Sequence, residues 1–252
     1  MAKLSVCIEM FWRELPYAER IRRTAAIGFE ACEFWGWRNK DGQSIKRALS
    51  ETGLALAAMS FEPSMTLIRR NAGMELETGM RGTAAFAAAV GCKTLIVTVG
   101  NTIDDETYEE SRRRVVRNLS AIGRIADDHG LTIVLEPLNT LANHHGYWLT
   151  KMAQAADIVD EVDLPSVKIL MDLYHQQITE GNLIENLRVH ASRIGHFHTA
   201  GVPGRHELVG GELDYAALFR AIDDTGYDGY VGLEYSPIID AGQSLRQALS
   251  LV

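Results

Sequence analysis

Four ionisable residues in the second half of the chain each end a short apolar run. In chain order they are Glu136, Asp172, His198 and Glu234. Three carboxylates gathered at the rim of an apolar core would repel one another and lose hydration, and a divalent cation would offset both effects. Three carboxylates and one imidazole form an oxygen-rich donor set without thiolates, which suits Mn²⁺ or Mg²⁺, tolerates Co²⁺ and argues against a structural Zn²⁺ site. We therefore expect the four side chains to bind one such cation and to leave coordination positions open for water or substrate.

The elements that must bring these residues together recur along the whole chain. Segments with helical periodicity alternate with short apolar runs, and several end in a glycine, such as Gly53 and Gly91, where a left-handed C-cap is needed. The runs start about 32 residues apart, close to the ~30 residues of a βαβ unit. Eight runs predict strands, at residues 4–9, 31–35, 54–61, 94–100, 132–137, 167–175, 193–200 and 230–236.

Eight such units in 252 residues predict an α/β fold, a (β/α)8 TIM barrel that forms a single domain over residues 1–252. The alternative is an open doubly wound sheet, which usually has a glycine-rich turn after its first strand. Here residues 10–14, which follow the first strand, are bulky and charged. In a barrel the active site lies at the carboxyl ends of the strands, which is where the four ionisable residues fall.

Composition restricts the partners and the compartment. The formal net charge is −8, and the densest basic run, at 112–114, lies beside acidic residues, so a nucleic-acid partner is not expected. No apolar run approaches the roughly 18 residues of a membrane span, and the first residues are too polar for a signal peptide. Cys7, Cys32 and Cys92 are odd in number, lack metal-ligand spacing and lie in or beside apolar runs. They predict reduced core thiols in a cytoplasmic protein that acts on a small molecule.

Two further histidines belong to the same mouth of the barrel. His175 follows Asp172 by three residues, and we expect it to bind or polarise the substrate because packing makes little demand beyond the strand end. His196 shares the inward face of the seventh strand with His198, one layer deeper, by the period of two along a strand. A core or supporting role is the preferred interpretation of His196, and substrate binding is the alternative.

The loops at the mouth offer an arginine and several aromatic residues. Arg205, after the seventh strand, can bind a substrate carboxylate or distal hydroxyl through its fork of donors, and an ion pair with Glu207 or Glu212 is the alternative. Trp12 is expected to contact the substrate. With the other aromatic residues after the first two strands it would wall the pocket and exclude water, and rim packing is the alternative. The other three aromatic residues are Phe11, Trp35 and Trp37.

Five motifs resemble the xylose-isomerase-like barrel superfamily and, within it, the hydroxypyruvate isomerase group. The resemblance extends from the first strand through Glu234, and the run at 201–207 is its most specific element. The motifs are Leu135-Glu136-Pro137-Leu138-Asn139, Met171-Asp172-Leu173-Tyr174-His175, Gly195-His196-Phe197-His198, Gly201-Val202-Pro203-Gly204-Arg205-His206-Glu207 and Gly232-Leu233-Glu234-Tyr235.

This resemblance implies a metal-dependent isomerase that converts hydroxypyruvate to tartronate semialdehyde, or acts on a related small 2-keto acid or ketose. It implies Glu136 and Glu234 as the catalytic pair, and both glutamates with Asp172 and His198 as the metal ligands. Such a reaction begins with removal of a C–H proton beside the carbonyl to give an enediolate, for which two carboxylates suffice as base and acid. The resemblance further implies a homo-oligomer, a dimer or tetramer, and the alanine-rich stretch at 84–90 is one helix surface that we expect to pack closely.

Two departures from the group's pattern leave the substrate open. Position 198 is commonly Gln in hydroxypyruvate isomerases, whereas the related ketose 3-epimerases have His there, so an epimerase of the tagatose or allulose type is the alternative function. The segment at 140–145, which includes Asn143, His144 and His145, also differs and is expected to line a different pocket. A metal-dependent phosphodiesterase like endonuclease IV would need more histidine ligands and a basic surface. A non-catalytic sugar-binding barrel would not need this ligand set.

Overall fold

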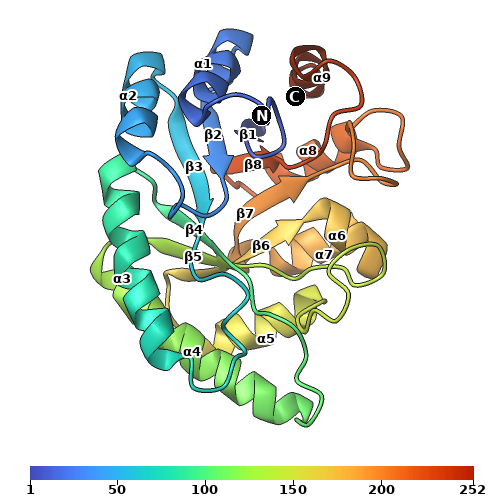
Figure 1. Cartoon of the computed structure of the whole chain (residues 1–252). Helices are drawn as coiled ribbons and strands as arrows, with labels where there is room; N and C mark the ends of the chain where they lie inside the picture. The colour runs from blue at the N-terminus through green and yellow to red at the C-terminus, as the bar shows by residue number, and fades with distance from the viewer.

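Eight parallel strands pair in chain order, and β8 pairs with β1 to close the sheet into a barrel (Figure 1). The computed structural model describes residues 1–252 and confirms the predicted (β/α)8 TIM barrel. The strands are β1 (Lys3–Cys7), β2 (Ala31–Phe34), β3 (Ala55–Ser60), β4 (Thr94–Val97), β5 (Thr132–Leu135), β6 (Val167–Asp172), β7 (Ile194–Thr199) and β8 (Tyr230–Leu233).

Helices surround the strands (Figure 1), and their apolar faces form one continuous core with the outward-facing strand residues. A short 3-10 turn at Ala191–Arg193 precedes β7. No helix is long and apolar enough to cross a membrane. The helices are α1 (Tyr17–Ile27), α2 (Gly42–Thr52), α3 (Gly73–Val90), α4 (Tyr108–Asp128), α5 (Met152–Val162), α6 (Leu173–Thr179), α7 (Leu183–His190), α8 (Tyr215–Asp223) and α9 (Ala241–Leu249).

The interior of the barrel is apolar on one side and polar on the other. Small and aliphatic residues from β3 to β6 form a separate buried cluster. Across the barrel, Ser5, Glu33, His196 and His198 are buried on β1, β2 and β7. Barrel interiors are ordinarily filled by aliphatic side chains, so buried polar residues on one side of the interior indicate a functional site there. The apolar cluster consists of Ala58, Ile96, Val134 and Leu170.

All eight strands end earlier than their apolar runs, because the pairing between strands stops before the apolar sequence does. Glu136 and Glu234 therefore lie one residue beyond β5 and β8. Their backbones remain anchored, since Glu136 N–H donates to the carbonyl of Val97 at 3.1 Å and Glu234 N–H to that of Thr199 at 3.0 Å. Both side chains thus start from fixed positions at the mouth.

The prediction of a strand over 167–175 is wrong at its end. The strand stops at Asp172, whose carboxylate accepts hydrogen bonds from the N–H groups of Tyr174 and His175 at 2.8 and 3.2 Å. A carboxylate in this position caps the N-terminus of a helix, so α6 begins at Leu173 without an intervening loop.

The structure confirms that Cys7, Cys32 and Cys92 are free and buried. In the alanine-rich stretch at 84–90, Ala84 and Ala87 are buried against the rest of the chain, whereas Ala85, Ala88 and Ala89 are exposed.

Candidate active site

The four residues that end β5 to β8 converge on one point. Glu136, Asp172, His198 and Glu234 are all buried, and each offers a ligand atom within 4.8 Å of those of the other three. His198 Nδ1 lies 3.7 Å from Glu136 Oε1 and 3.3 Å from Glu234 Oε2. The convergence follows from the fold, since consecutive parallel strands deliver their last residues to the same mouth.

A cavity of about 390 Å³ opens onto this cluster. Its wall includes side chains from loops on opposite sides of the barrel, among them Trp35, His144 and Arg205. His144 belongs to the segment at 140–145, so that segment contributes to this cavity. Three hydroxyl-bearing residues, Ser60, Ser64 and Thr98, also line the cavity.

Glu234 is held on both carboxylate oxygens. The indole Nε1–H of Trp35 donates to Oε1 at 2.6 Å, and Nη2 of Arg205 donates to Oε2. Nη2 of Arg205 also lies 3.9 Å from Asp172 Oδ2. The alternative pairing of Arg205 with Glu207 does not form, because Glu207 Oε1 accepts from the backbone N–H groups at 238 and 239 instead.

The two glutamates experience opposite electrostatic environments. Burial raises the pKa of Glu136 to about 7, against the opposing effect of His198. Burial would also raise the pKa of Glu234, but the positive charges of Arg205 and His198 hold it below its ordinary value. Such a separation of two neighbouring carboxylates is typical of acid–base sites.

His175 is fully buried in α6 and lines the cavity. The sequence-based reason for its role, that packing makes little demand there, is therefore wrong. Its Nδ1 accepts from the backbone N–H of Asn139 at 3.3 Å and lies 2.6 Å from that residue's side-chain nitrogen, so the proton of the neutral ring is on Nε2. Burial lowers the pKa of His175 to about 4, and Nε2 has no hydrogen-bond partner. His175 is thus a neutral imidazole at the cavity, whose protonated Nε2 lies 3.5 Å from Asp172 Oδ2 without forming an aligned hydrogen bond.

Two of the predicted substrate-binding residues do not line the cavity. His196 lies one layer deeper, with its ring centroid 5.1 Å from that of His198, as the supporting interpretation expected. Trp12 packs beside Phe11 at a centroid distance of 6.2 Å, and of the aromatic residues after the first two strands Trp35 lines the cavity.

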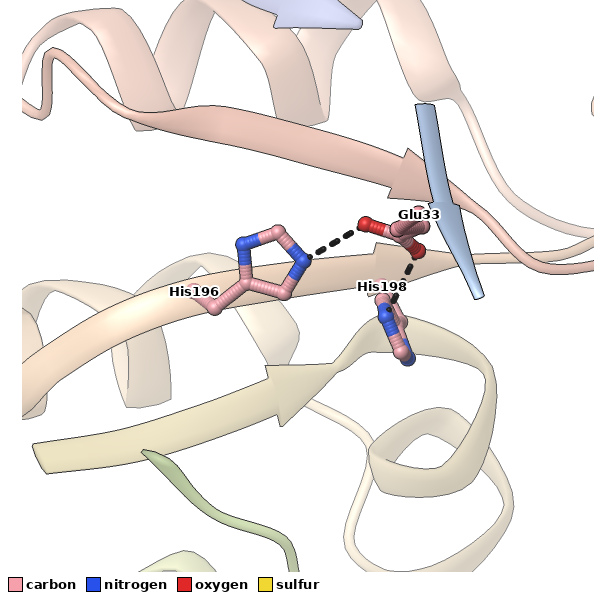
Figure 2. A group of neighbouring side chains, drawn as sticks. All are labelled: Glu33, His196 and His198. Atoms are coloured by element: carbon pink, nitrogen blue, oxygen red, sulfur yellow. Dashed lines mark hydrogen bonds and ion pairs between the residues drawn. The ribbon is translucent and has the colours of Figure 1, made fainter. Parts of the chain in front are cut away.

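Sequence reasoning missed Glu33. This residue is buried on β2 and lies between His196 and His198 (Figure 2). The available signal was a single glutamate inside the apolar run at 31–35. Burial would raise the pKa of Glu33, but the imidazoles of His198 and His196 lower it to about 2, so this fourth buried carboxylate is ionised.

The residues of the cluster fit a divalent cation. The donor set is three carboxylates and one imidazole, and the buried Nδ1 of His198 has no hydrogen-bond partner although carboxylate oxygens surround it. A cation among these atoms would satisfy the imidazole nitrogen and neutralise the repulsion between the carboxylates. A second group of three potential ligands, Glu33, His196 and His198, shares His198 with the first.

A closed parallel barrel with a buried carboxylate–imidazole cluster at its carboxyl end defines a (β/α)8-barrel enzyme. The sequence profile of the family described as Xylose isomerase-like TIM barrel matches residues 21–251, and the chain belongs to this family.

Among its relatives, the chain is 32% identical to a putative hydroxypyruvate isomerase of Danio rerio, over 94% of this chain and 91% of that protein. It is 31% identical to 2-oxo-tetronate isomerase of Cupriavidus necator, over 94% of both. With this fold and these relatives, the protein is an enzyme of the isomerase or epimerase kind.

Two solved structures share the fold over nearly the whole chain. A Brucella melitensis protein described as AP endonuclease, family 2, has a TM-score of 0.94 at 29% identity and covers 99% of both chains. The 3-keto-D-glucoside 4-epimerase of E. coli has a TM-score of 0.80 at 25% identity and covers 99% of this chain and 98% of that one.

Proposed function

We propose that this enzyme is a metal-dependent isomerase of a small keto acid or sugar, and that its substrate is hydroxypyruvate or a close relative, which it converts to the isomeric aldehyde. The observation that carries the proposal is the convergence of Glu136, Asp172, His198 and Glu234 at the base of a cavity of about 390 Å³. The names of the Danio and Cupriavidus relatives support the substrate class.

The cation would be held by the three carboxylates and by Nδ1 of His198. When bound, it would stabilise the negative charge that develops on the substrate's carbonyl oxygen, which is the chemistry that Mn²⁺ or Mg²⁺ supplies in such sites. Three of the four residues, Glu136, His198 and Glu234, also line the cavity, so a substrate bound there would contact them.

Proton transfer is the task of the two glutamates. In hydroxypyruvate a base removes a proton from the CH₂OH carbon to give an enediolate, and a proton returns to the neighbouring carbon. The terminal hydroxyl loses its proton and becomes the aldehyde, while the former carbonyl oxygen gains a proton and becomes the hydroxyl, so that the product is an isomer of the substrate. Glu234 is ionised at neutral pH because the guanidinium of Arg205 lowers its pKa, so we assign it as the acceptor. Glu136 lines the same cavity as Glu234, so we assign it as the second group that exchanges a proton with the substrate.

Two further side chains bind and orient the substrate in this proposal. Arg205 donates from Nη2 to the carboxylate of Glu234 and from Nε to its backbone carbonyl, which leaves Nη1 of the guanidinium for a substrate carboxylate. His175 donates its free Nε2–H to a substrate oxygen, because its Nδ1 is occupied by Asn139. Arg205 is positively charged and His175 is a neutral donor, so together they suit a substrate that carries a carboxylate.

A ketose or ketoside epimerase is the second candidate. A cavity of about 390 Å³ lies within the ordinary size range of small-molecule sites, so a five- or six-carbon sugar fits, and three hydroxyl-bearing residues line the cavity. The E. coli 3-keto-D-glucoside 4-epimerase shares the fold at 25% identity. In an epimerase, one glutamate would remove the proton and the other would return it from the opposite face.

The test is a substrate panel in D₂O. The Mn²⁺-loaded protein is incubated with hydroxypyruvate, tartronate semialdehyde, 2-oxo-tetronate and ketoses of four to six carbons, and deuterium incorporation is followed by NMR. Exchange with interconversion of hydroxypyruvate and tartronate semialdehyde supports the proposal, whereas exchange with inversion at one sugar carbon supports the epimerase. Cleavage of DNA at abasic sites, with no exchange on any small molecule, would overturn both.

A further inference from the structure

Glu33 is a buried carboxylate for which the proposed reaction has no direct use. It lies inside the barrel on β2, its side chain is 1% exposed, and it does not line the cavity. Aliphatic residues ordinarily occupy this interior, and burying a carboxylate is unfavourable unless it is paired. Its presence therefore calls for an explanation beyond packing.

Both oxygens of this carboxylate lie beside polar side chains, two of which, His196 and His198, are drawn in Figure 2. Its Oε2 accepts from the hydroxyl of Ser5 at 2.9 Å, and His196 Nε2 lies 3.0 Å from the same oxygen. Its Oε1 lies 2.9 Å from Nε2 of His198, a close polar contact without the alignment of a hydrogen bond. Ser5 and His196 thus fix Glu33 on one oxygen and leave the other for His198.

The two nitrogens of His198 face in opposite directions. Nε2 faces Glu33, deeper in the barrel, whereas Nδ1 faces the mouth, 3.3 Å from Glu234 Oε2 and 3.7 Å from Glu136 Oε1. The contact with Glu33 therefore determines which edge of the ring is presented to the three carboxylates of the candidate cation site.

Gly232 provides the space for this contact. It pairs with His198 in the register between β7 and β8. A Cβ at this position would lie 2.6 Å from Cδ2 of His198 and would overlap the carboxylate of Glu33. A side chain here would force the two residues apart, so the glycine and the Glu33–His198 pair belong to one arrangement.

We infer that Glu33 is a positioning residue that holds Nε2 of His198 so that Nδ1 serves as a cation ligand. This inference rests on the proposed function, because it needs a cation at the four-residue cluster. Its physical basis is general, since a carboxylate on the outer nitrogen of a ligating histidine fixes the orientation of the ring and strengthens its donor nitrogen. Glu33 contacts neither the substrate cavity nor the three carboxylates and acts only through His198.

The test is the affinity for Mn²⁺, measured by titration calorimetry without substrate. Glu33→Gln keeps the shape but removes the charge, and it should weaken binding by about 10–100-fold. Gly232→Ala perturbs the same contact from the opposite side without removing any polar group, and it should weaken binding in the same direction. Val231→Ala is the matched control, because Val231 is on the same strand but packs in the outer core. It should lower thermal stability and leave Mn²⁺ affinity within twofold of wild type.

Mn²⁺ affinities of Glu33→Gln and Gly232→Ala within twofold of wild type would overturn the inference, even if both variants unfold at lower temperature. If Glu33→Gln does not fold, the Mn²⁺ affinity of Gly232→Ala alone tests the inference, and a value within twofold of wild type overturns it. If the wild-type protein binds no Mn²⁺ or Mg²⁺, the cation of the proposed function is refuted instead. Crystal structures of the metal-free wild type and Glu33→Gln then decide on the positioning role: a displaced or turned His198 ring in the variant supports it, and an unchanged ring overturns it.

Discussion

Replacing Glu234 by Gln tests the proton transfer most directly. The carboxylate accepts from Trp35 Nε1 at 2.6 Å on one oxygen and from Arg205 on the other, with His198 Nδ1 3.3 Å from that second oxygen. A glutamine has the same shape and can keep one of these contacts through its carbonyl oxygen. Its NH₂ group must then face either Trp35 or Arg205, both of which are donors, and it cannot accept a proton from carbon.

The expected effect is large and falls on turnover. Loss of a positioned general base lowers the rate by about 10²–10⁴, which corresponds to about 3–5 kcal/mol in the activation barrier. The variant should still bind Mn²⁺, more weakly than wild type, because the amide oxygen remains a ligand. Turnover is therefore compared at saturating Mn²⁺, with the active substrate of the panel, together with the rate of deuterium exchange in D₂O.

Glu207→Gln is the matched control. Glu207 accepts from the backbone N–H groups of Ile238 and Ile239 and does not line the cavity, so the same chemical change there should leave turnover within about threefold of wild type. If Glu234→Gln keeps near-full turnover and deuterium exchange at saturating Mn²⁺, Glu234 is not the base. Turnover without deuterium exchange would instead indicate a hydride shift between the two carbons in place of the enediolate route.

Three further measurements test the cluster, and one tests the assembly. Asp172→Asn should act chiefly on Mn²⁺ affinity, so excess Mn²⁺ should restore part of its activity in a metal titration; a loss that no Mn²⁺ concentration relieves would contradict this. Because burial raises the pKa of Glu136 to about 7, Mn²⁺ must displace its proton at lower pH. The affinity measured by calorimetry should fall about fivefold or more from pH 7 to pH 6, and a constant affinity would refute the assignment of Glu136 as a ligand. His198→Gln should be the mildest change among the four ligands in a comparison of Mn²⁺ affinities, since a glutamine oxygen can replace the imidazole nitrogen; a loss larger than that of Asp172→Asn would show otherwise. Sedimentation at micromolar concentration should show a dimer or tetramer, and a monomer would contradict the oligomeric prediction.

The candidate site could be predicted to the extent that it depends on strand ends. Glu136, Asp172, His198 and Glu234 were found from one regularity, that each ends an apolar run in consecutive βα units. Barrel closure then requires their convergence, because parallel neighbours expose their carboxyl ends at one mouth. Strand ends were less accurate, since pairing between strands, rather than apolarity, decides where a strand stops.

Contacts between distant parts of the chain could not be predicted in this way. Glu33 contacts His196 across 163 positions, and Trp35 contacts Glu234 across 199 positions. Both pairs form because closure brings β1 against β8 and so places β2 near β7 and β8. The local pattern of the sequence around either residue does not indicate a contact with a residue so far away in the chain.

The sequence by itself determined the fold and the residue types at the mouth, because strand and helix periodicities are local and a barrel places every strand end on one side. Only the tertiary structure decided which atoms of those residues face one another: that Nδ1 of His198 faces the carboxylates, that Arg205 pairs with Glu234, and that His175 keeps a free Nε2–H. These orientations depend on packing and on hydrogen bonds between elements far apart in the chain. The chemistry of the site depends on them because a proton or a cation is bound by a particular atom in a particular direction.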